Sequence, residues 1–185
     1  MILPIYAYGQ PVLRKKAAPI DQQYPDVESL IQDMYETMYS AKGVGLAAPQ
    51  IGKDIRLFII DTLQINKKDQ VPTGIKRVFI NAEIVDESGE PWLYEEGCLS
   101  IPDIHVEIER NPTIRITYFD EQWNKHTDTF EGVNARVIQH EFDHIEGVLF
   151  IDRMKPLKRR MINRKLEKIK RGEIETNHPM RFVKI

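Results

Sequence analysis

The feature that most constrains this chain is a helical pattern over residues 134–147 that is largely apolar yet carries ionisable groups. Its apolar residues recur with a helical period, which predicts a buried helix. The middle of the pattern reads Gln139-His140-Glu141-Phe142-Asp143-His144. Unpaired charge among apolar neighbours is costly, so a buried helix carries such groups only where something compensates them. A bound metal ion would do so.

His140 and His144 are four residues apart, so both imidazoles project from one face of the helix and can reach a single metal ion. Glu141 lies beside the first histidine and can reach a water molecule at the ion without binding the ion itself. The five-residue H-E-x-x-H pattern also occurs by chance, so a metal site needs further support from the sequence.

A third ligand is required because catalytic centres of the zinc type usually take three protein ligands and leave one position for water. After His144, the acid Glu146 lies on another helix face, and His178 stands far beyond in a proline-flanked tail. Upstream, Cys98 follows Gly97, which allows close backbone approach, and a thiolate is a good soft ligand. The alternative for this lone cysteine is a small buried hydrophobic residue.

The composition is that of an ordinary globular protein, with 42% hydrophobic and 29% charged residues among 185. We therefore expect one domain over residues 1–185, of which residues 153–185 form a basic C-terminal helix and tail. One cysteine excludes an intrachain disulfide. No apolar run approaches the roughly 20 residues needed to span a bilayer, and no targeting segment is evident. We expect a monomer in the cytoplasm with no membrane partner.

The pattern of elements predicts an α+β fold, because strands follow one another instead of alternating with helices. Expected helices cover residues 26–41, 134–147 and 158–170. Expected strands cover residues 55–61, 77–85, 113–120, 125–130 and, briefly, 147–151, with an exposed loop at 66–74. Mixed or antiparallel sheets should pack around the central metal-binding helix, flanked by the N-terminal and C-terminal helices.

Three segments match the three signature motifs of the peptide deformylase family, in the family's order. They are Gly43-Val44-Gly45-Leu46-Ala47-Ala48-Pro49-Gln50, Glu96-Gly97-Cys98-Leu99-Ser100 and the segment from Gln139 to His144. The likeness runs from residue 1 to about residue 154, so the chain resembles this family over most of its length.

This resemblance implies hydrolysis of the N-formyl group of N-formylmethionyl nascent polypeptides, releasing formate and a free N-terminal methionine. It implies that Cys98, His140 and His144 bind one divalent metal ion. In this family the ion is usually Fe(II), with zinc, nickel or cobalt able to occupy the site.

The resemblance also implies catalytic roles for three residues. Glu141 would accept the proton of the attacking water, and the Gln50 side-chain amide and the Leu99 backbone N–H would stabilise the oxyanion. Backbone groups of Val44 and Gly45 would pair with an extended peptide as an added strand. The alternative for these glycine-flanked positions is a tight turn.

Specificity for methionine requires an apolar pocket. The resemblance makes Val44, Val133 and Val137 its expected wall, with ordinary core packing as the alternative. Glu96 and Gly97 are expected to shape the substrate-binding loop. Arg110 is expected as a partner of Glu96. Gln139 and Asp143 are expected behind the ligands, with Asp143 holding a ring N–H of His140. His105 and Arg136 are expected at the pocket rim.

Residues 153–171 contain ten Lys or Arg and a single acid, Glu167, although the whole chain has a net charge of −2. Such a segment is usually a solvated helix face, and the alternative is contact with the ribosome where the nascent chain emerges. Two rival functions remain open from the residues alone. One is a metallopeptidase that cleaves internal peptide bonds, and the other is a structural zinc module that binds RNA.

Overall fold

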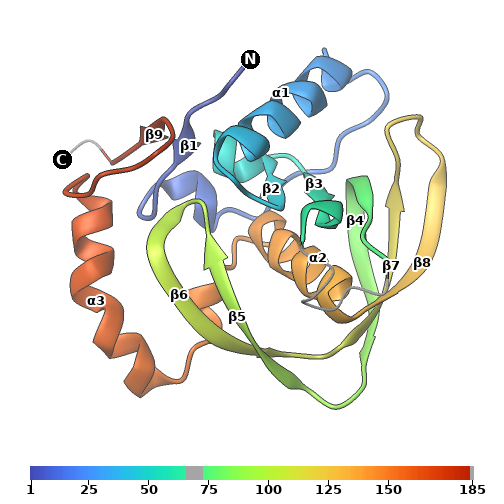
Figure 1. Ribbon diagram of the computed structural model, residues 1–185. Helices are drawn as coiled ribbons and strands as arrows, with labels where there is room; N and C mark the ends of the chain where they lie inside the picture. Colours follow the sequence, from blue (N-terminus) through green and yellow to red (C-terminus); the bar gives the residue numbers. More distant parts are fainter. Residues whose placement is uncertain (66–72, 184–185) are drawn as a thin grey trace.

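The computed structural model describes residues 1–65 and 73–183. Its helices are α1 (Val27–Ser40), α2 (Gly132–Ile145) and α3 (Pro156–Lys170). Its strands are β1 (Ile5–Tyr6), β2 (Gly45–Ala47), β3 (Leu57–Asp61), β4 (Lys76–Ser88), β5 (Trp92–Cys98), β6 (Ile101–Arg110), β7 (Thr113–Phe119), β8 (Lys125–Glu131) and β9 (Met180–Arg181). Helix α2 lies at the centre, with strands on both sides (Figure 1). The predicted α+β fold is confirmed.

The main sheet is antiparallel, with strand order β2-β3-β4-β7-β8. Strand β3 is buried along its whole length because helices cover both faces of the sheet. Phe58 and Ile60 point to the cluster that includes Ile138 of α2, whereas Leu57 belongs to the cluster with Met34 of α1. The main sheet therefore fixes the helix that carries the two histidines.

Strands β5 and β6 form a separate antiparallel ribbon on the other side of α2. The sequence analysis did not predict these strands. Their buried face includes Ile104 and Ile108, but charged Glu96 and Arg110 lie on it too and interrupt the apolar alternation. Asp103, with a φ of 60°, and a register shift after Glu96 disturb it further. This ribbon ends at Cys98 and so delivers the thiol to α2.

The strand predicted at residues 147–151 was wrong. Gly147 has a φ of 74° and turns the chain back, and Val148 N–H donates to the Asp143 carbonyl at the end of α2. A 3-10 helix, Phe150–Arg153, follows, with the Asp152 carboxylate accepting from Leu149 N–H. Of the exposed loop predicted at 66–74, residues 66–72 lie outside the described residues. Within the described part of the chain, no helix combines the length and apolar character needed to cross a bilayer.

The C-terminal elements belong to the folded body. Leu166 and Ile169 of α3 are buried against the β5–β6 ribbon, in a cluster that includes Ile104 and Ile108. Strand β9 pairs in parallel with β1, so a segment near the start of the chain lies beside a segment near its end (Figure 1). Helix α3 is thus amphipathic, with one apolar stripe packed and one exposed basic face.

Replacing Leu166 with alanine should destabilise the protein by about 2–5 kcal/mol, because it leaves a cavity under α3. Met161 on the same helix is 79% exposed, so its replacement with alanine should change stability by less than about 0.5 kcal/mol. Urea unfolding of both variants measures the difference. Equal effects would show that α3 is not docked as described.

Candidate metal centre and active site

The candidate metal ligands come together from two elements that are distant in sequence. Helix α2 places His140 and His144 on one face, and the end of β5 brings Cys98 opposite them. The ligand atoms of the three residues all lie within 4.8 Å of one another, and Cys98 Sγ is 3.4 Å from His144 Nε2. This arrangement can hold a metal ion, with soft sulfur and imidazole donors suited to a transition metal.

A buried carboxylate holds one of these histidines. Glu96 Oε1 is 3.0 Å from His140 Nδ1, which leaves His140 Nε2 to face the site. Two guanidinium groups hold Glu96 in turn: Arg110 makes two hydrogen bonds of 2.8 and 2.9 Å, and Arg136 makes one of 2.9 Å. Burial alone would raise the pKa of Glu96, but the hydrogen bonds from His140 and Arg110 outweigh it and hold that pKa well below its usual value.

Two positions differ from their predicted places. Asp143 does not hold His140, because Glu96 occupies that ring nitrogen; the Asp143 carboxylate accepts from Arg110 and Arg153 instead. Arg136 is only 1% exposed and lies over the rings of Trp92 and Tyr94, so it lines the inside of the pocket and not its rim.

Gln139, predicted to lie behind the ligands, is buried on the same helix, and its described side-chain hydrogen bonds go to backbone carbonyls and not to a candidate ligand. Its side-chain amide donates to the carbonyls of Asn111 and Ala135. His105 is exposed at the mouth of the pocket, close to Gly97, where an added Cβ would lie 2.7 Å from the imidazole.

The surroundings of the two candidate ligand histidines shift their pKa values in opposite directions. Burial alone would lower the pKa of His140, but hydrogen bonds to Cys98 and Glu96 outweigh it and hold that pKa well above its usual value. Burial and the neighbouring His140 charge hold the pKa of His144 well below its usual value. The site therefore favours a proton on one of the two imidazoles and not on both, and a bound cation would take the place of that single positive charge.

Glu141 is buried beside this centre. Its Oε2 atom has no hydrogen-bond partner among the described residues, and burial raises its pKa to about 7. An added Cβ at Gly45 would lie 2.5 Å from Glu141 Oε1, so only glycine lets β2 pass so close to the carboxylate. An unpaired buried oxygen next to three ligand atoms fits a site built to hold an ion and a water molecule.

Gln50 and Leu99 flank the thiol. The Gln50 Oε1 atom accepts from Ala47 N–H, which turns the Nε2 group toward the site, 3.5 Å from Cys98 Sγ and 3.2 Å from Ser100 Oγ. Leu99 lies in the turn between β5 and β6, and Tyr8 N–H holds the following Ser100 carbonyl at 2.9 Å. Both predicted donors thus lie next to the ligand group.

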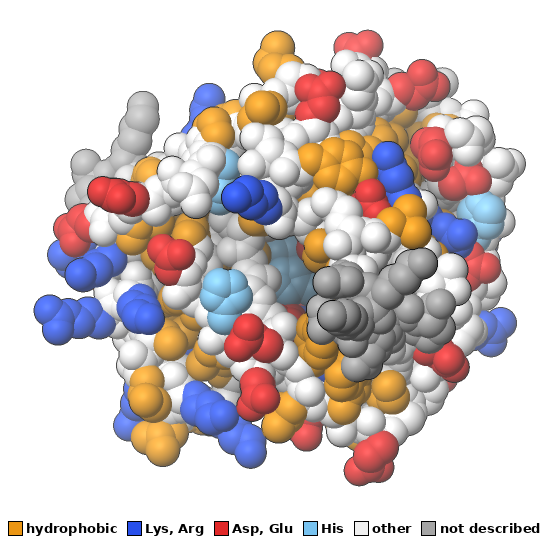
Figure 2. All heavy atoms as spheres, viewed as in Figure 1, with side chains coloured by type: hydrophobic (Ala, Val, Ile, Leu, Met, Phe, Trp, Pro, Cys, Tyr) orange, Lys and Arg blue, Asp and Glu red, His pale blue; other side chains and the backbone are white. Residues whose placement is uncertain are grey.

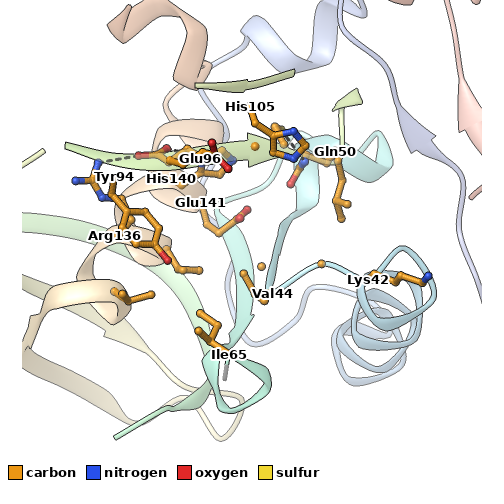
Figure 3. Close-up of a pocket in the computed structure, with 18 residues that line it drawn as sticks. Lys42, Val44, Gln50, Ile65, Tyr94, Glu96, His105, Arg136, His140 and Glu141 are labelled. Carbon is orange, nitrogen blue, oxygen red and sulfur yellow. Dashed lines mark hydrogen bonds and ion pairs between the residues drawn. The ribbon is translucent and has the colours of Figure 1, made fainter. Parts of the chain in front are cut away.

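A cavity of about 400 Å³ opens in front of these residues, a size suited to a small ligand group. Figure 2 shows the hollow on this face, with histidine side chains visible in it. Figure 3 shows Glu96, His140 and Glu141 grouped together, with Val44 and Ile65 across the space from them. The lining includes every predicted substrate-binding residue, namely Val44, Gly45, Glu96, Gly97, Val133 and Val137.

Four lining residues were missed by the sequence analysis: Lys42, Ile65, Tyr94 and Glu95. Tyr94 stands two positions before Glu96 on the same face of β5, so recognition of this strand would have found it. Ile65 reaches the pocket only through the turn after β3, which no local pattern indicates.

Taken together, a helix with two histidines one turn apart, a thiol opposite them and a buried carboxylate define an α+β metal-dependent hydrolase. Comparison with known proteins specifies the family. The profile of the polypeptide deformylase family matches residues 2–160. The chain belongs to this family, and it removes N-formyl groups from nascent peptides.

Individual relatives agree over nearly the full length. A peptide deformylase of Christiangramia forsetii is 50% identical over 189 residues, covering 98% of this chain and 96% of the relative. The crystal structure of a peptide deformylase from Legionella pneumophila matches with a TM-score of 0.81 and 40% identity, covering 94% of this chain and 98% of that one. The peptide deformylase from Thermus thermophilus matches with a TM-score of 0.82 and 39% identity, covering 93% and 99%.

Replacing Glu96 with glutamine should destabilise the protein by about 3–5 kcal/mol, because Arg110 and Arg136 would lose their buried anionic partner. The matched control is Glu95→Gln on the adjacent, exposed position, which should change stability by less than about 0.5 kcal/mol. Thermal and urea unfolding of the metal-free proteins provide the measurement. A Glu96→Gln variant as stable as the control would contradict the network described here.

Proposed function

We propose that Cys98, His140 and His144 bind the catalytic divalent ion of this deformylase, natively Fe(II), with zinc, nickel or cobalt as substitutes. The observation that carries this proposal is the convergence of three ligand atoms beside the unpaired carboxylate oxygen of Glu141. When bound, the ion would acidify a water molecule and polarise the formyl oxygen. The choice of iron rests on the family resemblance.

Glu141 is the proposed proton carrier. Its carboxylate accepts a proton as water adds to the formyl carbon, and returns that proton to the amine nitrogen as the C–N bond breaks. The products are formate and the free amino terminus. A pKa near 7, caused by burial, suits a group that must both accept and release a proton at neutral pH.

Gln50 and Leu99 are the proposed donors to the oxyanion. The Gln50 amide is 2% exposed and its orientation is fixed by Ala47 N–H, so it needs little reorganisation during the reaction. Leu99 N–H belongs to a turn anchored through Ser100. Loss of one such donor typically costs about 2.7–4 kcal/mol of transition-state stabilisation.

The substrate peptide would bind along β2, which has a neighbouring strand on one side only among the described residues. Val44 and Gly45 would offer backbone groups to it, which accepts many sequences. Val44, Val133 and Val137 would form the apolar wall for the methionine side chain. Glu96 has its carboxylate oxygens engaged by Arg110, Arg136 and His140, so its proposed role is to hold the site together and not to contact substrate.

The exposed face of α3 is a proposed contact for the ribosome. Lys and Arg side chains gather over this helix at the left of Figure 2. Nascent formylmethionyl chains emerge from the ribosome, and phosphate groups there would attract such a face. We also propose that the chain acts as one domain, because β9 pairs with β1 and α3 packs on the β5–β6 ribbon. As in the sequence analysis, the proposed form is a monomer in the cytoplasm.

Replacing Glu141 with glutamine should lower kcat for a formyl-Met peptide by about 100- to 10,000-fold while metal content stays unchanged, because only the proton acceptor is lost. Glu131→Gln, in an exposed position just before α2, is the control and should retain full activity. Formate release and elemental analysis of both variants test this. Full activity in Glu141→Gln would rule out the assigned role.

Replacing Arg164, Lys165 and Lys168 of α3 with serine should weaken cosedimentation with ribosomes and flatten its salt dependence. Hydrolysis of a short formyl peptide should stay unchanged, because these side chains are exposed and are not among the residues that line the pocket. The matched control replaces Lys53, Arg115 and Lys125, which are also exposed. Equal binding by the two triple variants would argue against this surface.

A further inference from the structure

A row of ion pairs leads from the surface to the metal site. Arg153 stands at the end of the 3-10 helix just before α3, and its side chain is 41% exposed. Its Nε and Nη2 atoms each donate to the Asp143 carboxylate at 2.7 Å. Asp143 is 4% exposed, so this is a bidentate pair that reaches from solvent into the interior.

The row continues without a gap. Asp143 Oδ2 also accepts from Arg110 Nη1 at 2.8 Å, and the other donors of Arg110 hold both oxygens of Glu96. Glu96 Oε1 in turn holds His140 Nδ1 at 3.0 Å. Four consecutive contacts thus connect Arg153 with a proposed metal ligand.

Neighbouring residues in this row share hydrogen-bond partners, so loss of the Arg153 side chain should disturb the contacts beyond it. Among the described residues, Asp143 Oδ1 accepts a side-chain hydrogen bond from Arg153 alone. Without Arg153, a buried carboxylate oxygen is left unpaired, which is costly. Asp143 can regain a partner by drawing Arg110 toward it, and Arg110 would then leave Glu96. His140 would lose the fixed orientation that Glu96 gives it.

We propose that Arg153 is a positioning residue for the metal centre, acting on His140 through Asp143, Arg110 and Glu96. This rests on the proposed metal ligands and extends the site to a residue outside the cavity lining. It also assigns a role to one cation of the basic segment, at the point where α3 joins the catalytic body.

The test compares Arg153→Met with Arg153→Lys in zinc-loaded protein. The methionine variant should release zinc to a chelator about tenfold faster, the lower end of the effect seen for partners of metal ligands. Its kcat should fall by a similar factor with KM for a formyl-Met peptide unchanged, because the substrate pocket is intact. The lysine variant keeps the charge but loses the bidentate geometry, so its zinc release should be intermediate.

Arg14→Met is the matched control. Arg14 forms a two-bond pair with Asp152, next to Arg153 in sequence, but this pair is exposed and contacts no site residue. Its zinc release and kcat should equal those of the wild type.

A purely structural role for Arg153 would lower the unfolding midpoint of the metal-free protein and leave zinc release and kcat unchanged, which would overturn the inference. If the methionine variant does not fold, wild-type zinc release in the lysine variant would overturn it equally. A wild-type protein that held no stoichiometric iron, zinc, nickel or cobalt would instead overturn the proposed metal centre.

Discussion

The buried carboxylate of Glu96 is the interaction on which the rest of the site depends. Charge is tolerated in a protein interior only when it is paired and hydrogen-bonded. Glu96 comes from β5, Arg110 from β6, and Arg136 and His140 from α2, so this one group joins the ribbon to the central helix. Cys98 lies two residues further along β5. The position of the thiol relative to the imidazoles therefore follows from the Glu96 network.

Features that depend on the spacing of nearby residues could be predicted from the sequence. The i, i+4 histidines and the apolar period predicted α2 and two candidate ligands, and the alternation of apolar and polar residues predicted β7. The sequence could not determine which carboxylate meets His140, because Asp143 is nearer in sequence while Glu96 arrives through the packing of β5 on α2. The β5–β6 ribbon was missed because its buried face mixes apolar residues with the charged Glu96 and Arg110, and the network requires these two charged groups. The third ligand could be chosen only by exclusion and by resemblance.

Gly45 lies both beside Glu141 and on the strand edge where the substrate peptide is proposed to pair. It lies on β2, at the free edge of the main sheet, and its missing side chain leaves room for Glu141. A peptide paired with this edge would therefore pass directly over the carboxylate. In the proposed binding mode, the backbone that would accept many sequences also limits where the reacting bond lies. Selectivity for methionine would then come from the proposed apolar wall of the pocket.

The parallel pairing of β1 with β9 has a consequence for how the molecule assembles. Ile5 pairs with Met180, so this contact closes a loop that contains almost the entire chain. Closing so large a loop is entropically expensive until the intervening segments have already collapsed. The two-strand seam should therefore form late. Tyr8, just beyond β1, donates to the Ser100 carbonyl, so this seam lies next to the turn that carries Leu99.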